Sequence, residues 1–277
     1  MVEVGSIQTS IQLTYMKQKI YQVDAFAKQI FSGNPAAVCP LDKWLPDQLM
    51  QKIAMENNLA ETAFYVKEGD QFTIRWFTPA VEVDLCGHAT LAAAFVLFDK
   101  EGYEGDTINF HSPRSGPLTV SKNQNLLSLN FPADIIEPAH LTTDLKALFN
   151  QQPQEVFKGK TDYMFVFENE TEIKNCKPDL AKVAGLDVRG IIITAPGYST
   201  DFVSRFFAPR VGINEDPVTG SAHTTLTPYW AGRLNKNDLS AIQLSERKGY
   251  LQCTLSGDRV EISGEARLYM TGEIEVS

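Results

Sequence analysis

Hydrophobic residues recur along the chain with two periods, which predict many strands and a few helices. Apolar and polar residues alternate over residues 19–26, as in a half-buried strand, and a helical spacing runs over 46–57. The two most apolar segments, 88–100 and 221–234, predict buried helices, and Pro228 inside the second implies a kink or a late start. Further strands are expected at 36–39, 72–77, 107–110, 118–120, 126–131, 163–167, 190–194, 202–207, 241–246, 251–255, 259–263 and 266–270, with shorter helices at 141–149 and 178–184.

One stretch of the chain occurs twice. The first copy reads R-W-F-T-P-A-V-E-V-D-L-C-G-H-A-T from Arg75, and the second reads R-F-F-A-P-R-V-G-I-N-E-D-P-V-T-G-S-A-H-T from Arg205. In each copy a proline ends a strand, because proline cannot donate to a ladder, and a loop then leads to a glycine and an apolar helix. The duplication predicts an α+β fold of two similar domains related by a pseudo-two-fold axis, each with its sheet around a central helix. We expect them at residues 18–132 and 133–277, with 132–138 as the linker and the last strand a candidate to cross back.

The starts of the two repeated helices are candidate anion sites. Gly87 and Gly220 precede His88 and Ser221, and Ser221 is of a type that caps helices. Free backbone N–H groups at a helix start attract anions, so two facing starts would hold a small carboxylate between the domains. The alternative is that glycine merely begins two core helices.

Composition excludes several classes of function. The 277 residues carry a net charge of −9 and no basic run, which argues against nucleic acid or an anionic membrane as a partner. The four cysteines are far apart and form no C-x-x-C, which indicates neither a zinc site nor a disulfide scaffold and favours a reduced, cytoplasmic setting. No phosphate-binding loop, dinucleotide fingerprint or metal-ligand cluster is present in the sequence, so no cofactor is expected. The first sixteen residues lack a signal-peptide pattern, and no run approaches the roughly 20 apolar residues of a membrane helix.

Glu61 is the candidate acid and base. It is the only charged residue between Asn57 and Val66 and begins an apolar strand, so burial is expected to raise its pKa towards neutrality. The alternative is a solvated glutamate at a helix–strand junction. Asn34, in the turn S-G-N-P, is a candidate for contact with substrate, with turn formation as its alternative.

The motifs V-D-A-F-x-x-x-x-F-x-G-N-P-A-A-V, N-L-A-E-T-A-F, C-G-H-A-T and E-D-P-V-T-G-S-A-H together resemble the phenazine-biosynthesis PhzF-like isomerase family, which shares the diaminopimelate-epimerase-like fold. The resemblance implies a cofactor-free active site between two barrel-like domains, and a homodimer. It implies that Glu61 shuttles the proton and that Gly87 and Gly220 bind the substrate carboxylate. It also implies accessory catalytic roles for His88, Asp216 and Ser221. A capping role for His88 and a turn-forming role for Asp216 remain as alternatives.

Amino-acid racemases of this wider fold use two facing cysteines as acid and base. Cys86 would be one of them, and an alignment of the repeats puts Pro217 at the other position, which disfavours a two-thiol mechanism and leaves Cys86 as a buried filler. The predicted function is therefore a cofactor-independent isomerase that moves a proton on a small carboxylated metabolite. A racemase or epimerase at a single carbon and a non-catalytic binding protein are the alternatives.

Overall fold

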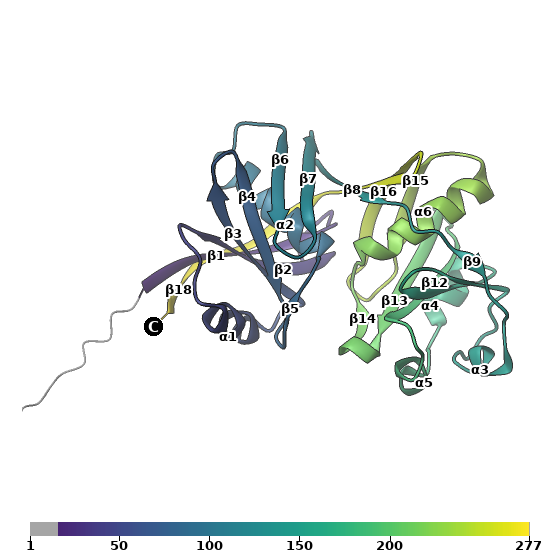
Figure 1. Ribbon diagram of the computed structural model, residues 1–277. Coiled ribbons are helices and arrows are strands. Elements are labelled where there is room, and N and C mark those ends of the chain that lie inside the picture. The colour runs from purple at the N-terminus through teal and green to yellow at the C-terminus, as the bar shows by residue number, and fades with distance from the viewer. Residues whose placement is uncertain (1–15, 277) are drawn as a thin grey trace, which may run out of the picture.

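In the computed structural model, which describes residues 16–276, the chain forms two lobes that lie side by side, each with a sheet curved around one helix (Figure 1). Of the first sixteen residues, all except Met16 lie outside the described residues. None of the helices in the described chain is both long and apolar enough to span a membrane.

The first lobe holds the central helix α2 (Gly87–Asp99), whose residues from His88 to Ala94 are all buried. It packs against β1, β2, β3 and β8. The elements of this half are β1 (Met16–Ala25), β2 (Asn34–Leu41), α1 (Asp47–Asn57), β3 (Glu61–Glu68), β4 (Gln71–Phe77), β5 (Glu82–Val83), β6 (Thr107–Ser112), β7 (Gly116–Asn123) and β8 (Leu126–Pro132).

The second lobe holds the central helix α6 (Gly220–Leu234), which packs against β15, β16 and β17. The elements of this half are β9 (Glu137–Pro138), α3 (Thr143–Lys146), β10 (Glu155–Lys158), β11 (Asp162–Val166), α4 (Glu170–Asn175), α5 (Leu180–Ala184), β12 (Gly190–Pro196), β13 (Phe202–Ala208), the 3₁₀ helix η1 (Pro209–Val211), β14 (Ile213–Asp216), β15 (Asp238–Gln243), β16 (Gly249–Ser256), β17 (Arg259–Gly264) and β18 (Ala266–Val276).

Strand pairing shows the duplication directly. β8 pairs with β17 between the lobes, and the strands follow outward as β7, β6, β4, β3, β2, β1, β18 on one side and β16, β15, β13, β12, β11, β10, β9 on the other. On both sides only the third and the fifth of these pairings are parallel, and the others are antiparallel. The predicted α+β fold with pseudo-two-fold duplication is therefore confirmed. The last strand, β18, pairs with β1 of the other lobe (Figure 1), and we propose that the domains otherwise divide at residues 132 and 133.

The repeated arginines secure the two loops that lead to the helix starts. Arg75 holds the Glu82 carboxylate with two hydrogen bonds of 2.7 and 2.9 Å, and Arg205 holds Glu215 with the same two distances. Five positions separate each glutamate from the glycine of its helix. The three additional residues of the second loop therefore lie between Arg205 and Glu215, where the chain forms η1.

The two helix starts meet between the lobes. A methyl group built on Gly220 would lie 4.0 Å from the Cα of Gly87. In the described chain neither helix start has a side-chain capping bond, and Ser221 lies in the first turn, one residue after Gly220. The prediction of Ser221 as the N-cap is therefore wrong, because the helix begins earlier, after Thr219. Within residues 16–276, the N–H groups at both starts have no side-chain oxygen to cap them.

Pro228 leaves α6 continuous, so the predicted late start is also wrong. Proline lacks the N–H that would bond to the carbonyl of Thr224, four residues earlier. That carbonyl instead accepts the backbone N–H of Asp134 at 3.1 Å. The segment that links the two halves is thereby attached to the central helix of the second lobe.

Candidate active site

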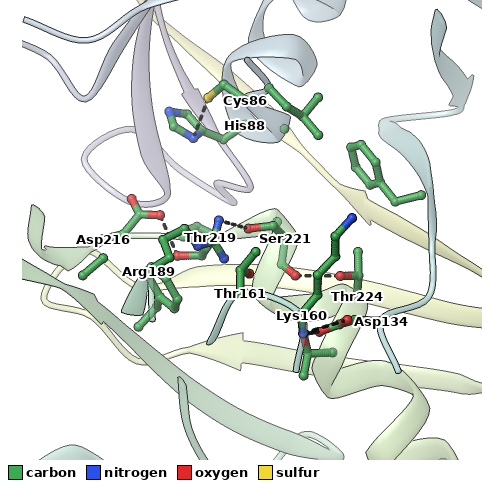
Figure 2. Close-up of a pocket in the computed structure, with 18 of the residues that line it drawn as sticks. Cys86, His88, Asp134, Lys160, Thr161, Arg189, Asp216, Thr219, Ser221 and Thr224 are labelled. Carbon is green, nitrogen blue, oxygen red and sulfur yellow. Dashed lines mark hydrogen bonds between the residues drawn. The ribbon is translucent and has the colours of Figure 1, made fainter. Parts of the chain in front are cut away.

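A cavity of about 460 Å³ lies at the two helix starts and is lined by residues of both lobes. Figure 2 shows His88 and Cys86 on one side of it and Ser221, Arg189 and Lys160 on the other. The structure places six of the seven predicted site residues in its wall: Glu61, Gly87, His88, Asp216, Gly220 and Ser221. The seventh, Asn34, is fully buried behind it.

Glu61 and His88 form a buried pair at one end of the cavity. His88 Nε2 lies 3.1 Å from Glu61 Oε2, and these side chains are only 6% and 11% exposed. Glu61 is the first residue of β3, and His88 is the second residue of α2. The start of a strand and the start of a helix therefore bring the two groups together. Neither of these two atoms makes an aligned hydrogen bond with any residue in 16–276.

The charges of this pair are coupled. Burial works to raise the pKa of Glu61, but the charge and the N–H of His88, with a contribution from Cys86, outweigh it, and the pKa lies below the ordinary value. Burial likewise works to lower the pKa of His88, but Cys86 and the Glu61 carboxylate raise that pKa well above its ordinary value. The expected rise in the pKa of Glu61 is therefore wrong, because the sequence around Glu61 does not contain the partner that reverses the effect of burial.

Asp216 joins this group from the second lobe. Burial raises its pKa to about 6, against the effects of His88 and of the Thr219 hydroxyl, which donates to Asp216 at 2.5 Å. The amide of Asn34 donates to Asp216 at 2.8 Å and to the carbonyl of Val218 at 3.0 Å. Because an amide nitrogen has only two hydrogens, these bonds use both of them. The amide nitrogen of Asn34, which also lies 3.2 Å from His88 Nδ1, thus links the lobes, while its oxygen is buried without a hydrogen-bond partner in residues 16–276.

Cys86 is buried beside this pair, and its Sγ lies 3.5 Å from His88 Nδ1. Burial, aided by the Glu61 charge, raises the pKa of Cys86 to about 11, so the thiol is neutral near pH 7. Cys86 contacts Nδ1 and Glu61 contacts Nε2 of the imidazole, and the three residues each offer one possible metal-ligand atom, all within 4.8 Å of one another. The residue of α6 that corresponds to Cys86 is Thr219 rather than Pro217. Cys86 directly precedes Gly87, and Thr219 directly precedes Gly220.

The other end of the cavity contains two cations that sequence reasoning missed. Arg189 binds the buried carboxylate of Asp162 through two nitrogens and donates a third bond, of 3.0 Å, to the Ser221 hydroxyl. Lys160 extends its side chain along the wall beside Ser221 (Figure 2). Both residues lie outside the repeated stretch, so comparison of the two copies does not reveal them.

Comparison with known proteins agrees with this architecture. The family model described as phenazine biosynthesis-like protein, PhzC-PhzF, matches residues 23–272. A Pseudomonas aeruginosa protein named as an isomerase is 52% identical over 263 residues, which cover 95% of this chain and all of that protein. The crystal structure of a PhzF-family protein from Enterococcus faecalis superimposes with a TM-score of 0.91 at 48% identity, over 94% of this chain and 99% of the other. A structure from Pseudomonas aeruginosa described as a predicted epimerase shares the fold, with a TM-score of 0.72 at 19% identity over 94% of this chain and all of the other. The chain belongs to the phenazine biosynthesis-like PhzC-PhzF family.

Proposed function

We propose that this protein is a cofactor-independent isomerase that moves a proton on a small carboxylated substrate, with Glu61 as the general acid and base. Membership of the family, together with relatives named as isomerases, supports an isomerase or epimerase. The proposal of a single carboxylate base depends on the site itself. The homodimer and the cytoplasmic location stay predictions of the sequence.

The observation that carries the proposal is the pair of buried, unsatisfied atoms at the cavity wall. Glu61 Oε2 and His88 Nε2 are both inaccessible to solvent, and within the described chain each has only the other, at 3.1 Å and without an aligned hydrogen bond. Buried polar atoms are nearly always paired, and those left unpaired cost about 1–3 kcal/mol each. A buried carboxylate and imidazole that have only each other, without an aligned bond, therefore indicate a site where a ligand supplies the missing hydrogen bonds.

The paired helix starts supply the anchor. Gly87 and Gly220 bring their backbones together without side chains between them, and the N–H groups of both first turns lack side-chain caps in the part described. A carboxylate bound there would lie next to Glu61 and His88. Binding at two helix ends adds the attraction of both helix dipoles to the hydrogen bonds.

The proposed reaction then requires a single base, Glu61, that carries one proton at a time. Glu61, ionised because of its lowered pKa, takes a proton from an activated carbon, and the electron pair shifts along the unsaturated substrate. Protonated Glu61, after exchange with solvent, then gives a proton to another carbon on the same face. His88 and Asp216 steady the charge that develops, and Ser221 orients the substrate. A lowered pKa favours the second step, because the protonated carboxylic acid gives up its proton readily.

A racemase at a single carbon is the second candidate, and it needs two bases on opposite faces. Strand register identifies the residue that matches Glu61 in the other lobe. Thr62 pairs with Phe77, and Ile191 with Phe207, so Glu61 corresponds to Gly190. Cys86 likewise corresponds to Thr219. A second base is thus missing at both matching positions, which favours the one-base isomerase.

The test is to incubate the protein in deuterium oxide with a panel of cyclohexadiene carboxylates and β,γ-unsaturated carboxylates, alongside L- and D-amino acids. An isomerase moves the double bond and incorporates deuterium only at the carbon that becomes protonated. Exchange at the α-carbon of an amino acid, with inversion, would instead show a racemase. Binding without any exchange would favour a non-catalytic protein.

A further inference from the structure

The pseudo-two-fold axis relates the proton-transfer end of the cavity to the end that contains Lys160. Ala36 pairs with Glu61, and Asp162 pairs with Gly190, so Ala36 and Asp162 correspond. Two residues earlier in each copy, Gly33-Asn34 corresponds to Gly159-Lys160. A ligand anchored at the helix starts therefore has the Asn34 group on one side and Lys160 at the matching place on the other. The first side carries the proposed chemistry, and Lys160 on the second side has no role in it.

The backbone of Lys160 is held in place while its ammonium group is left free. Asp134 is anchored to α6 by its N–H and by a bond from the Thr225 hydroxyl at 2.9 Å to its carboxylate. That carboxylate accepts the backbone N–H of Lys160 at 3.3 Å, and a methyl group on Gly159 would lie only 2.3 Å from it. Within residues 16–276, no carboxylate oxygen lies within ion-pair distance of the Lys160 ammonium. Figure 2 shows that group pointing away from Asp134.

Arg189 adds directed donors beside Lys160. Its fork is locked by the buried Asp162, so it is already ordered before any ligand binds. Ser221 accepts a bond from Arg189, which leaves the proton of the Ser221 hydroxyl available to a ligand. The net charge of this end is near zero, because Asp134 and Asp162 offset the two cations. Selectivity for an anion would therefore come from the free ammonium and hydroxyl donors.

We infer that Lys160, with Arg189 and Ser221, forms a subsite for a second carboxylate, so that the substrate is a dicarboxylate. This inference rests on the proposed function, since it takes the helix starts as the site of the first carboxylate. A charge-assisted hydrogen bond at the second carboxylate contributes about tenfold or more to affinity.

The experiment compares succinate, glutarate, adipate and pimelate with their monoamides by isothermal titration calorimetry on the full chain. Each pair has the same length and differs only in the second charge. We expect one length at which the diacid binds about tenfold more tightly than its monoamide. Lys160→Met should abolish that preference and leave the affinity of the monoamide unchanged. Lys158→Met is the matched control, because Lys158 lies over the Tyr163 ring, outside the cavity.

Equal binding of diacid and monoamide at every length, including no binding by either, would overturn the inference. A preference that persists in Lys160→Met would also overturn it. Glu61→Gln separates this result from the proposed chemistry. Loss of proton exchange in Glu61→Gln without any diacid preference in the wild type would leave the isomerase and remove the subsite. If the wild type prefers the diacid but proton exchange survives in Glu61→Gln, the subsite stands and Glu61 is not the base.

Discussion

Replacement of Glu61 by glutamine tests the proposed base with the smallest change in shape. Glutamine keeps the volume and the reach of the side chain but cannot accept a proton from carbon. The side chain is only 11% exposed and lies 3.1 Å from His88, so the substitution removes one buried charge from a coupled pair. Loss of the attraction to His88 and relief of the burial cost oppose each other. We therefore expect the fold to survive with little change in melting temperature.

The expected loss of rate in Glu61→Gln follows from the proposed role of Glu61 as general acid and base. Removal of a general acid or base lowers the rate by about 10²–10⁴, which is about 3–5 kcal/mol in activation free energy. A glutamate with only a structural part in the site would lower the rate by far less. Substrate binding should change little, because the proposed anchor is the pair of helix starts at Gly87 and Gly220, which the substitution leaves intact.

The assay follows deuterium uptake at carbon in deuterium oxide, with the substrate that the wild-type screen identifies. Glu68→Gln is the matched control, since Glu68 ends the same strand, is exposed and accepts a bond from the Thr73 hydroxyl at 2.7 Å. We expect wild-type exchange in Glu68→Gln and nearly none in Glu61→Gln, with ligand binding retained. Exchange at the wild-type rate in Glu61→Gln would refute the assignment, and Asp216 would then be the next carboxylate to replace.

Three further outcomes are expected. Cys86→Ala should keep most of the activity, with or without a chelator, because the buried thiol stays neutral near pH 7; loss of turnover in a folded Cys86→Ala would reinstate a thiol or metal mechanism. Arg205→Met should lower the unfolding free energy by about 2–4 kcal/mol in urea titrations, because it leaves the partly buried Glu215 unpaired, and Arg75→Met should lower it by less, because Arg114 still pairs with Glu82; a change below the error of the titration in Arg205→Met would contradict the role of the repeated arginine. Burial lowers the pKa of His223 from 6.5 to about 4, so the folded state resists protonation and stability falls as the pH drops through this window. Between pH 6.5 and 4, the unfolding free energy of His223→Thr, which copies Thr90 at the matching position, should fall by up to about 3 kcal/mol less than that of the wild type. Equal acid sensitivity of the two proteins would show that His223 is not the cause.

The duplication was visible in the sequence because both copies retain the residues that build the strand, the turn and the helix start. The repeated arginine closes each loop on a glutamate, and Thr90 and His223 each donate to the carbonyl of the residue before the paired glycine. These contacts are local, so their residues recur at nearly constant spacing. Pattern reading therefore located both central helices and most of the long strands.

Other features depend on contacts between distant segments and could not be read from the sequence. The helix expected over residues 141–149 is reduced to the single turn Thr143–Lys146, because Leu148 and Phe149 are drawn into the core of the second lobe. The sequence pattern did not predict strand β10, which is held in the sheet by its pairing with β9 and β11. The pKa of Glu61 was assigned the wrong direction because His88 lies 27 positions away in the sequence.

The chemistry of the site follows from where the two copies differ. Glu61 corresponds to Gly190, and no side chain fits there, because a methyl group on Gly190 would lie 2.6 Å from the carbonyl oxygen of Phe207. The second lobe therefore cannot gain a matching carboxylate by a single substitution without a shift of its strands. With the proposed base in one lobe and Lys160 in the other, the cavity has a direction. A substrate that binds in it presents one face to Glu61, which is the condition for a proton shift on a single face and excludes inversion by an opposed pair of these residues.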